Sequence, residues 1–274
     1  MTQPIKLPQP GDVLNNTELC ATFLCSPQGG MRRSHKTNTL VIVSNHVRSI
    51  YDDRWDNGIL HYTGMGTTGG QSLDFAQNKT LAQSNESQIQ VHLFEVFVDL
   101  EYVYIGAVAL AAEPYFEQQP DQNGLFREVC VFPLKLKNGE LSPIDKNHLN
   151  RVFETKTKKA KRLNDEEVER RAKNARKNVG SRKAIIQQHE RNPWVVEHAK
   201  RLAKGFCQLC NQPAPFKNKS DEPYLETHHI IWLAKGGEDT IANTVALCPN
   251  CHRKMHIQNE KNDIQKLQKL CEKS

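Results

Sequence analysis

Four cysteines in two identical pairs constrain the fold of this chain more than any other feature. Cys207 and Cys210 form one CxxC pair, and Cys248 and Cys251 form the other. Each pair can present two thiolates to one face of a metal ion, and four thiolates complete the tetrahedral shell of a structural zinc ion. Reduced cysteines of a core would not explain the repeated spacing. The gap of 37 residues between the pairs exceeds that of a compact zinc ribbon, so we expect a folded segment there.

The segment that follows the first pair is rich in histidine. His252 and His256 stand four residues apart after "CPNC", so on a helix they share one face and could hold one ion. His228 and His229 end a short strand, where neighbours face opposite sides, so we expect different roles for them. "KGGED" then turns the chain and Asn243 lies on the way back. The predicted layout is strand, turn, strand, helix.

The pattern "HH…N…CH" inside paired CxxC knuckles resembles the HNH nuclease motif of the ββα-metal fold. The variant with four cysteines looks most like the C-terminal half of the McrA-type modified-DNA restriction endonucleases. The resemblance covers roughly Asn192–His256. One departure is Trp232, which stands where the family usually has proline, and we expect it to change the turn rather than the chemistry.

This resemblance implies a catalytic site next to the zinc. His229 would be the general base that activates water, and Asn243 would orient its imidazole. His228 and His252 would hold a catalytic divalent cation, with His256 as a further ligand. Mg²⁺, Mn²⁺, Co²⁺ and Ni²⁺ all remain open as that cation, because histidine ligands admit several metals.

The rest of the chain divides by composition into two parts. "LVIVS", "QVHLFEVFV", "EYVYIGAVAL" and "REVCVFPLKL" are β-branched and aromatic runs bounded by turn residues, so residues 12–137 predict a barrel or sandwich, with a short helix near 72–84. From about Asn150 large apolar residues become rare, and "NDEEVERRAKNARK" has the acids first and the bases later, as a helix prefers. We therefore predict residues 1–140 as one domain, 141–191 as a helical connector and 192–274 as the zinc domain.

Charge follows the same division. Residues 1–140 carry 10 Lys/Arg against 15 Asp/Glu, residues 151–183 carry 13 against 5, and residues 184–274 carry 13 against 10, which gives about −5, +8 and +3. A polyanion would be drawn to the connector and the zinc domain. A solvated linker is the alternative interpretation of the basic run.

The stretch "IYDDRWDNGILHYTGMGTTGGQSLDFAQNKTLAQ" could be an ordinary barrel loop with two packed tyrosines. It also resembles the SRA (SET- and RING-associated) domain, which reads modified cytosine, in its Tyr, acidic residues, "YTG-G" and "Q-L…N-AL". The resemblance covers about Gly11–Leu136. It implies a flipped base stacked between Tyr51 and Tyr62, beside Thr63 and Gly64, with an acidic side chain reading the Watson–Crick edge.

Two departures affect this base pocket. The spacing between the tyrosines is one residue shorter than usual, which leaves both Asp52 and Asp53 open as the reading residue, and we favour Asp53. The later family "YDG" appears as "YIG" at Tyr104–Gly106, which leaves open whether this chain keeps that loop of the family.

The sequence thus predicts an α+β, multidomain protein: an SRA-like β-barrel, a basic helical connector and a zinc-stabilised ββα-metal (HNH) domain. We expect an endonuclease that recognises 5-methyl- or 5-hydroxymethylcytosine in double-stranded DNA, acts in restriction of foreign DNA, and works as a homodimer at least on DNA. The alternatives are an HNH nuclease that reads a phosphorothioate or a plain sequence, and a non-catalytic zinc-containing DNA reader.

The chain also gives an expectation about compartment. No apolar run approaches the ~18 residues of a membrane span, and "MTQPIKLPQP" has no signal-peptide core. We expect a cytoplasmic protein without a membrane partner, in which Cys20, Cys25, Cys130 and Cys271 are ordinary thiols.

Overall fold

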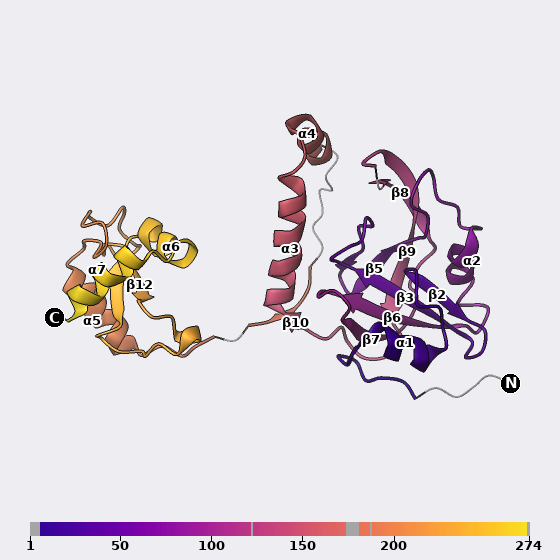
Figure 1. The fold of residues 1–274 in the computed structure, drawn as a ribbon, viewed down its shortest axis with the longest axis horizontal. Helices are drawn as coiled ribbons and strands as arrows, with labels where there is room; N and C mark the ends of the chain where they lie inside the picture. Colours follow the sequence, from indigo (N-terminus) through magenta and orange to yellow (C-terminus); the bar gives the residue numbers. More distant parts are fainter. Residues whose placement is uncertain (1–5, 122, 174–180, 187, 273–274) are drawn as a thin grey trace. The chain divides into compact units, whose positions relative to one another are not determined.

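The computed structural model describes residues 6–121, 123–173, 181–186 and 188–272. The chain divides into two compact units, Met1–Ile186 and Gln187–Ser274 (Figure 1). Within the described residues, no helix combines the length and the apolar character needed to cross a membrane.

The first unit is built on one nine-stranded sheet. Its strands are β1 (Val13–Leu14), β2 (Met31–Ser34), β3 (Thr39–Asn45), β4 (Arg54–Asp56), β5 (Ile59–Thr63), β6 (Gln90–Val96), β7 (Tyr102–Leu110), β8 (Tyr115–Pro120) and β9 (Phe126–Leu136). The order is β2-β3-β6-β7-β9-β5-β4, with β1 paired to β7 and β8 to β9. The pair β3–β6 is parallel and the others are antiparallel. The predicted β-rich fold is confirmed, and the stretch "EYVYIGAVAL", predicted to be a strand, forms β7 with Tyr104–Gly106 inside it.

Both faces of this sheet are covered. Along β3, Leu40 and Ile42 enter one apolar cluster and Val41 and Val43 enter another, as the alternation of a strand requires. Helix α1 (Asn16–Phe23) begins with a capping box at Asn15 and buries its apolar residues in the second cluster. Helix α2 (Ala76–Ala82) lies within the segment predicted to be helical.

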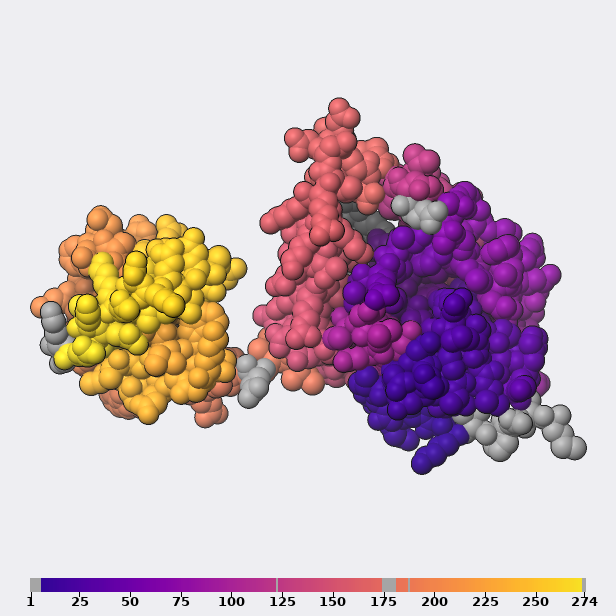
Figure 2. Space-filling view, in the orientation of Figure 1, coloured from indigo at the N-terminus to yellow at the C-terminus, as the bar shows by residue number. Residues whose placement is uncertain are grey.

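The connector returns to the first unit. It contains β10 (Ile144–Asp145), α3 (Lys146–Ala160), α4 (Asp165–Lys173) and β11 (Ala184–Ile185). Helix α3 buries no side chain, and Figure 2 shows it on the outer surface. The parallel pairing of β10 with β11, which the sequence did not predict, joins the two ends of the connector. Residues 174–177, the end of the stretch "NDEEVERRAKNARK" predicted to be helical, lie outside the described residues.

The second unit has the predicted strand, turn, strand, helix layout. Its elements are α5 (Pro193–Ala203), β12 (Glu226–His229), the 3₁₀ turn η1 (Leu233–Lys235), β13 (Thr244–Leu247), α6 (Pro249–Ile257) and α7 (Lys261–Cys271). Strands β12 and β13 pair antiparallel. Asn192 caps α5 by accepting from the backbone of Trp194, and Gly205 follows its end with a positive φ of 81°. A small core around Val245, Leu247 and Met255 holds the unit together.

Candidate active site and base pocket

The four cysteines of the two CxxC pairs converge on one point. The Sγ atoms of Cys207, Cys210, Cys248 and Cys251 all lie within 4.8 Å of one another. Burial raises the pKa of Cys207, but backbone hydrogen bonds outweigh burial and lower it to about 7. Burial and the neighbouring thiols raise the pKa of Cys251. A ring of four thiols that cannot all ionise without a cation fits tetrahedral zinc.

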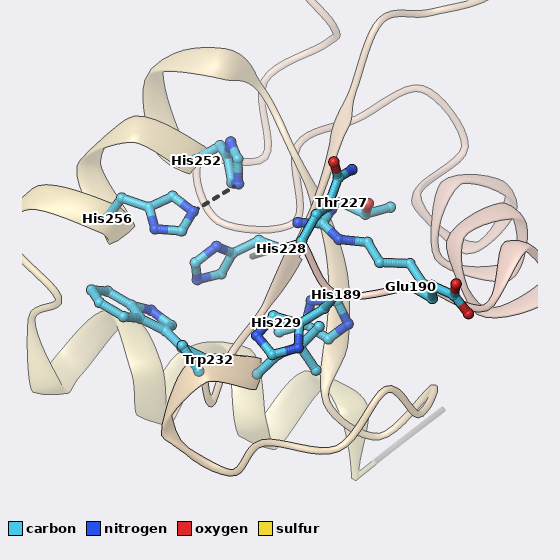
Figure 3. A pocket seen from close by; sticks show the side chains of 12 residues that line it. His189, Glu190, Thr227, His228, His229, Trp232, His252 and His256 are labelled. Carbon is cyan, nitrogen blue, oxygen red and sulfur yellow. Dashed lines mark hydrogen bonds between the residues drawn. The ribbon is translucent and has the colours of Figure 1, made fainter. Parts of the chain in front are cut away.

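Three of the predicted histidines form a second cluster. The ligand nitrogens of His228, His252 and His256 lie within 4.8 Å of one another. Figure 3 shows their rings gathered side by side, and the Nε2 atoms of His252 and His256 are 3.1 Å apart. His228 is 1% exposed, and neither of its ring nitrogens has a hydrogen-bond partner in the described structure. A buried imidazole with both nitrogens unpaired is the state expected of a metal ligand.

The surroundings of two of these histidines favour the neutral imidazole. Burial and then the neighbouring His256 and His252 lower the pKa of His228 to about 3. Burial also lowers the pKa of His256. Neutral imidazoles carry the lone pairs that bind a cation, so the cluster suits a divalent metal at neutral pH.

Glu226 orients one of these histidines. Its Oε2 lies 2.5 Å from Nδ1 of His252, and its Oε1 accepts from the hydroxyl of Tyr224 at 3.2 Å. A carboxylate on one ring nitrogen fixes the hydrogen there and turns the other nitrogen toward the metal. Glu226 was not predicted as a site residue, because a lone acid two residues before a histidine pair has no distinctive spacing.

His229 faces a different partner from its neighbour. Its Nε2 lies 2.8 Å from Oδ1 of Asp239, and the residue is 6% exposed. The side chain of Asn243, predicted to orient this imidazole, instead donates to the carbonyls of Ile231 and Glu238 and accepts from the amide of Ile231. Asn243 therefore fixes the loop between β12 and β13 rather than the ring itself.

The four predicted histidines line one cleft of about 880 Å³ in the second unit (Figure 3). Its walls include both neighbouring histidines and the two histidines of α6, together with residues 188–191. Trp232 also lines it, with its ring 5.3 Å from that of His256. The replacement of proline by Trp232 therefore alters the wall beside the histidine cluster as well as the turn.

The predicted base pocket is a second cavity, of about 580 Å³, in the first unit. Tyr51, Tyr62, Thr63 and Gly64 all line it. The hydroxyl of Tyr51 donates to the carbonyl of Gly66 at 3.1 Å. Tyr62 is 3% exposed and belongs to the core of the sheet, with its hydroxyl 2.9 Å from a backbone carbonyl. The two tyrosines thus line the same cavity. Tyr62 is also part of the hydrophobic core of the sheet, whereas Tyr51 is not.

The two aspartates differ in their surroundings. Oδ1 of Asp53 accepts from the amide of Thr63 at 2.8 Å, and burial raises the pKa of Asp53 to about 6. Asp52 is exposed, and its amide donates to Gln119 at 3.2 Å. Gly64 has no room for a side chain, since a Cβ there would lie 2.8 Å from Oδ1 of Asn78. Neither aspartate is among the residues that line the cavity. Asp53 is, however, hydrogen-bonded to Thr63, which does line it.

Comparison with protein families defines the class. Residues 10–148, just over half of the chain, match the family described as "ScoMcrA-like, SRA domain", and residues 207–258 match "HNH endonuclease". The chain therefore belongs to the ScoMcrA-like SRA domain family and carries an HNH domain after it.

Individual relatives match parts of this arrangement. The chain is 45% identical over 90 residues to the Type IV methyl-directed restriction enzyme EcoKMcrA of Escherichia coli (strain K12), a match that covers 31% of this chain and 32% of that enzyme. It is also similar to the Type IV phosphorothioation-dependent restriction endonuclease ScoMcrA, with a TM-score of 0.41, 17% identity, and coverage of 97% of this chain and 64% of that one. A SUVH5 SRA complex with methylated CHH DNA matches with a TM-score of 0.39 and 23% identity, over 51% of this chain and 96% of that one. The chain thus spans about a third of its curated relative.

Proposed function

We propose that this chain is a modification-dependent DNA endonuclease, in which the SRA domain takes up a modified cytosine and the HNH domain cuts the backbone nearby. The observation that carries the proposal is the buried His228 ring, unpaired at both nitrogens, between two helix histidines and next to His229. A non-catalytic reader would have no use for that set beside a separate cluster of four cysteines.

The chemistry assigns a separate task to each group. We place a structural zinc ion at the four cysteines and a divalent cation at His228, His252 and His256. When bound, that cation offsets charge on the phosphate and on the leaving oxygen. His229 takes a proton from the attacking water, and Glu226 holds His252 in the tautomer that presents Nε2.

The first unit supplies the recognition. A flipped cytosine would enter the cavity beside Tyr51, stack on it and on Tyr62, and present its Watson–Crick edge to Asp53. A carboxylate is a suitable acceptor for the exocyclic amine of cytosine. We favour Asp53 over Asp52 because Asp53 accepts a hydrogen bond from the amide of Thr63, a residue that lines the cavity.

The connector would supply affinity that does not depend on sequence. Helices α3 and α4 bury no side chain and carry many Lys and Arg side chains on the surface. When such cationic side chains bind phosphates, counterions are released from the DNA, and this gain does not depend on base sequence. Removal of positive charge from the connector should therefore weaken binding to modified and unmodified DNA alike. An unchanged salt dependence after replacement of Lys156, Lys158 and Lys161 by Gln would show that the connector is only a linker.

A double-strand break requires a second site, because one HNH site cuts one strand. We propose that two chains assemble on the DNA. Mixing wild type with a His229→Ala chain of equal affinity should then give nicked circles at the expense of linear DNA. A yield of linear DNA proportional to the wild-type fraction would refute assembly in pairs.

The proposal is tested by digestion of matched plasmids that carry cytosine, 5-methylcytosine, 5-hydroxymethylcytosine or phosphorothioate links. We expect metal-dependent cutting of one of the cytosine marks only. Cutting confined to the phosphorothioate plasmid would support the alternative reader, and cutting of all four would support a plain nuclease. Mark-specific binding without cutting under any divalent metal would support the non-catalytic reader.

A further inference from the structure

A single carboxylate in the second unit holds two groups that are distant in sequence. Oδ1 of Asp239 lies 2.8 Å from Nε2 of His229, and its Oδ2 lies 2.5 Å from the backbone nitrogen of Asn192, the residue that caps α5. Hydrogen bonds from Asn192 and then His229 hold the pKa of Asp239 below its ordinary value. Both oxygens therefore act as acceptors at neutral pH.

This arrangement determines which nitrogen of His229 carries the hydrogen. Since the carboxylate can only accept, Nε2 of His229 must donate, and Nδ1 keeps the lone pair. Glu226 binds His252 through the opposite nitrogen, Nδ1, and leaves Nε2 beside His256. Asp239 thus selects the Nε2–H tautomer of His229, which is expected to act as a base. Glu226 selects the Nδ1–H tautomer of His252, which is expected to bind a cation.

We propose that Asp239 is the positioning residue of His229, fixing its tautomer and tying its ring to the start of α5. The inference rests on the proposed function, with His229 as the base. In the reaction an O–H bond of water breaks and its proton goes to Nδ1, while the oxygen bonds to phosphorus. The P–O bond to the leaving sugar oxygen breaks, and solvent protonates that oxygen. Asn243 fixes the loop that connects His229 to Asp239.

The Asp239→Asn variant separates this role from simple packing. An amide has nearly the same volume but only one acceptor oxygen, so it cannot accept from both His229 and Asn192. If its NH₂ faces the ring, it donates to Nε2 and forces the hydrogen onto Nδ1. If its oxygen faces the ring, the tie to α5 is lost. Asparagine should therefore be nearly as damaging as alanine.

Asp221→Asn is a matched control. It makes the same change in the same unit at an exposed residue, whose ion pair with Lys217 at 2.9 Å contributes little. Single-turnover nicking of modified plasmid should be slowed about 100-fold or more by Asp239→Asn and Asp239→Ala, the range of general base catalysis. In both Asp239 variants, the affinity for the plasmid, the zinc content and the melting temperature should match those of the Asp221→Asn control. A wild-type nicking rate in Asp239→Asn would overturn the proposal.

A second measurement does not depend on activity. ¹⁵N NMR of the histidine rings, with the His229 signals assigned by their loss in His229→Ala, reports which nitrogen is protonated in the neutral ring. Wild type should show the Nε2–H tautomer, and Asp239→Ala should shift toward a mixture. An Nδ1–H tautomer in wild type would refute the positioning role, whether or not the chain cuts DNA. The absence of any DNA cleavage by wild type would instead refute the proposed function.

Discussion

The guanidinium of Arg182 is buried against the carboxylate of Glu95, which precedes it by 87 residues. The two side chains are 7% and 0% exposed. Glu95 also accepts from Trp55 at 3.0 Å and His46 at 2.9 Å, and Arg182 lies over the rings of Trp55 and Phe97. Burial alone would raise the pKa of Glu95, but the bond from His46 and the charge of Arg182 lower it. The far end of the connector is therefore part of the core of the first unit.

We expect Arg182→Ala to lower the free energy of unfolding of the first unit by about 3–5 kcal/mol, because it leaves a buried carboxylate without its cation. A fragment ending at residue 148 should be destabilised for the same reason. Denaturant unfolding followed by tryptophan fluorescence measures this. Lys183→Ala is the control, since its partner Glu140 is 3.6 Å away and both are exposed. Equal unfolding curves for the two variants would contradict the account.

We expect Cys248→Ala to lose the zinc ion and the fold of the second unit together, because binding energy at such a site is folding energy. Zinc content and melting temperature measure the loss, and Cys271→Ala, outside the cluster, should keep its zinc. A Cys248→Ala chain with full zinc and unchanged melting would rule out the four-cysteine site.

Residues with a regular spacing were predictable from the sequence, and residues linked only by tertiary contact were not. The CxxC pairs and the i, i+4 histidines show their geometry in the spacing itself. Asp239 is one of two adjacent acids in the loop between β12 and β13, and its contact with His229 becomes apparent only when the two strands pair. Arg182 was one base among many in a basic run, and nothing local distinguishes it from its exposed neighbour Lys183. The role assigned to Asn243 came from resemblance, and its hydrogen bonds differ from that expectation.

Tyr51 offers a cleaner test of base stacking than Tyr62, whose removal would also open a cavity in the core. We expect Tyr51→Ala to weaken binding of modified DNA by about 1–3 kcal/mol, the range of base–aromatic stacking, and to leave unmodified DNA unaffected. Tyr51→Phe keeps the ring and loses only the bond to Gly66, so it should retain the preference. Equal losses on both DNAs in Tyr51→Ala, measured by titration of paired oligonucleotides, would refute stacking.

The raised pKa of Asp53, about 6, predicts a pH dependence of recognition. The accepting carboxylate prevails above that pH and the protonated acid below it, so the ratio of affinities for modified and unmodified DNA should fall from pH 7.5 to pH 5. The native state also holds this proton more tightly than the unfolded state, whose pKa is near 3.8, so Asp53 makes the free energy of unfolding fall as pH rises from about 4 to 6. Asp53→Asn should abolish the pH dependence of recognition and remove the contribution of Asp53 to the pH dependence of unfolding. A ratio in wild type that does not change with pH would exclude Asp53 as the reading residue.

The most direct test of the whole account compares wild type and His229→Ala on two oligonucleotide duplexes that differ only in one cytosine mark, with a divalent cation present. Binding and strand cleavage are measured on the same samples. We predict that wild type binds the marked duplex more tightly and cuts it, and that His229→Ala keeps the binding preference and the zinc but cuts neither duplex. Cleavage by His229→Ala at the wild-type rate, or equal binding and cleavage of both duplexes by wild type, would contradict the account.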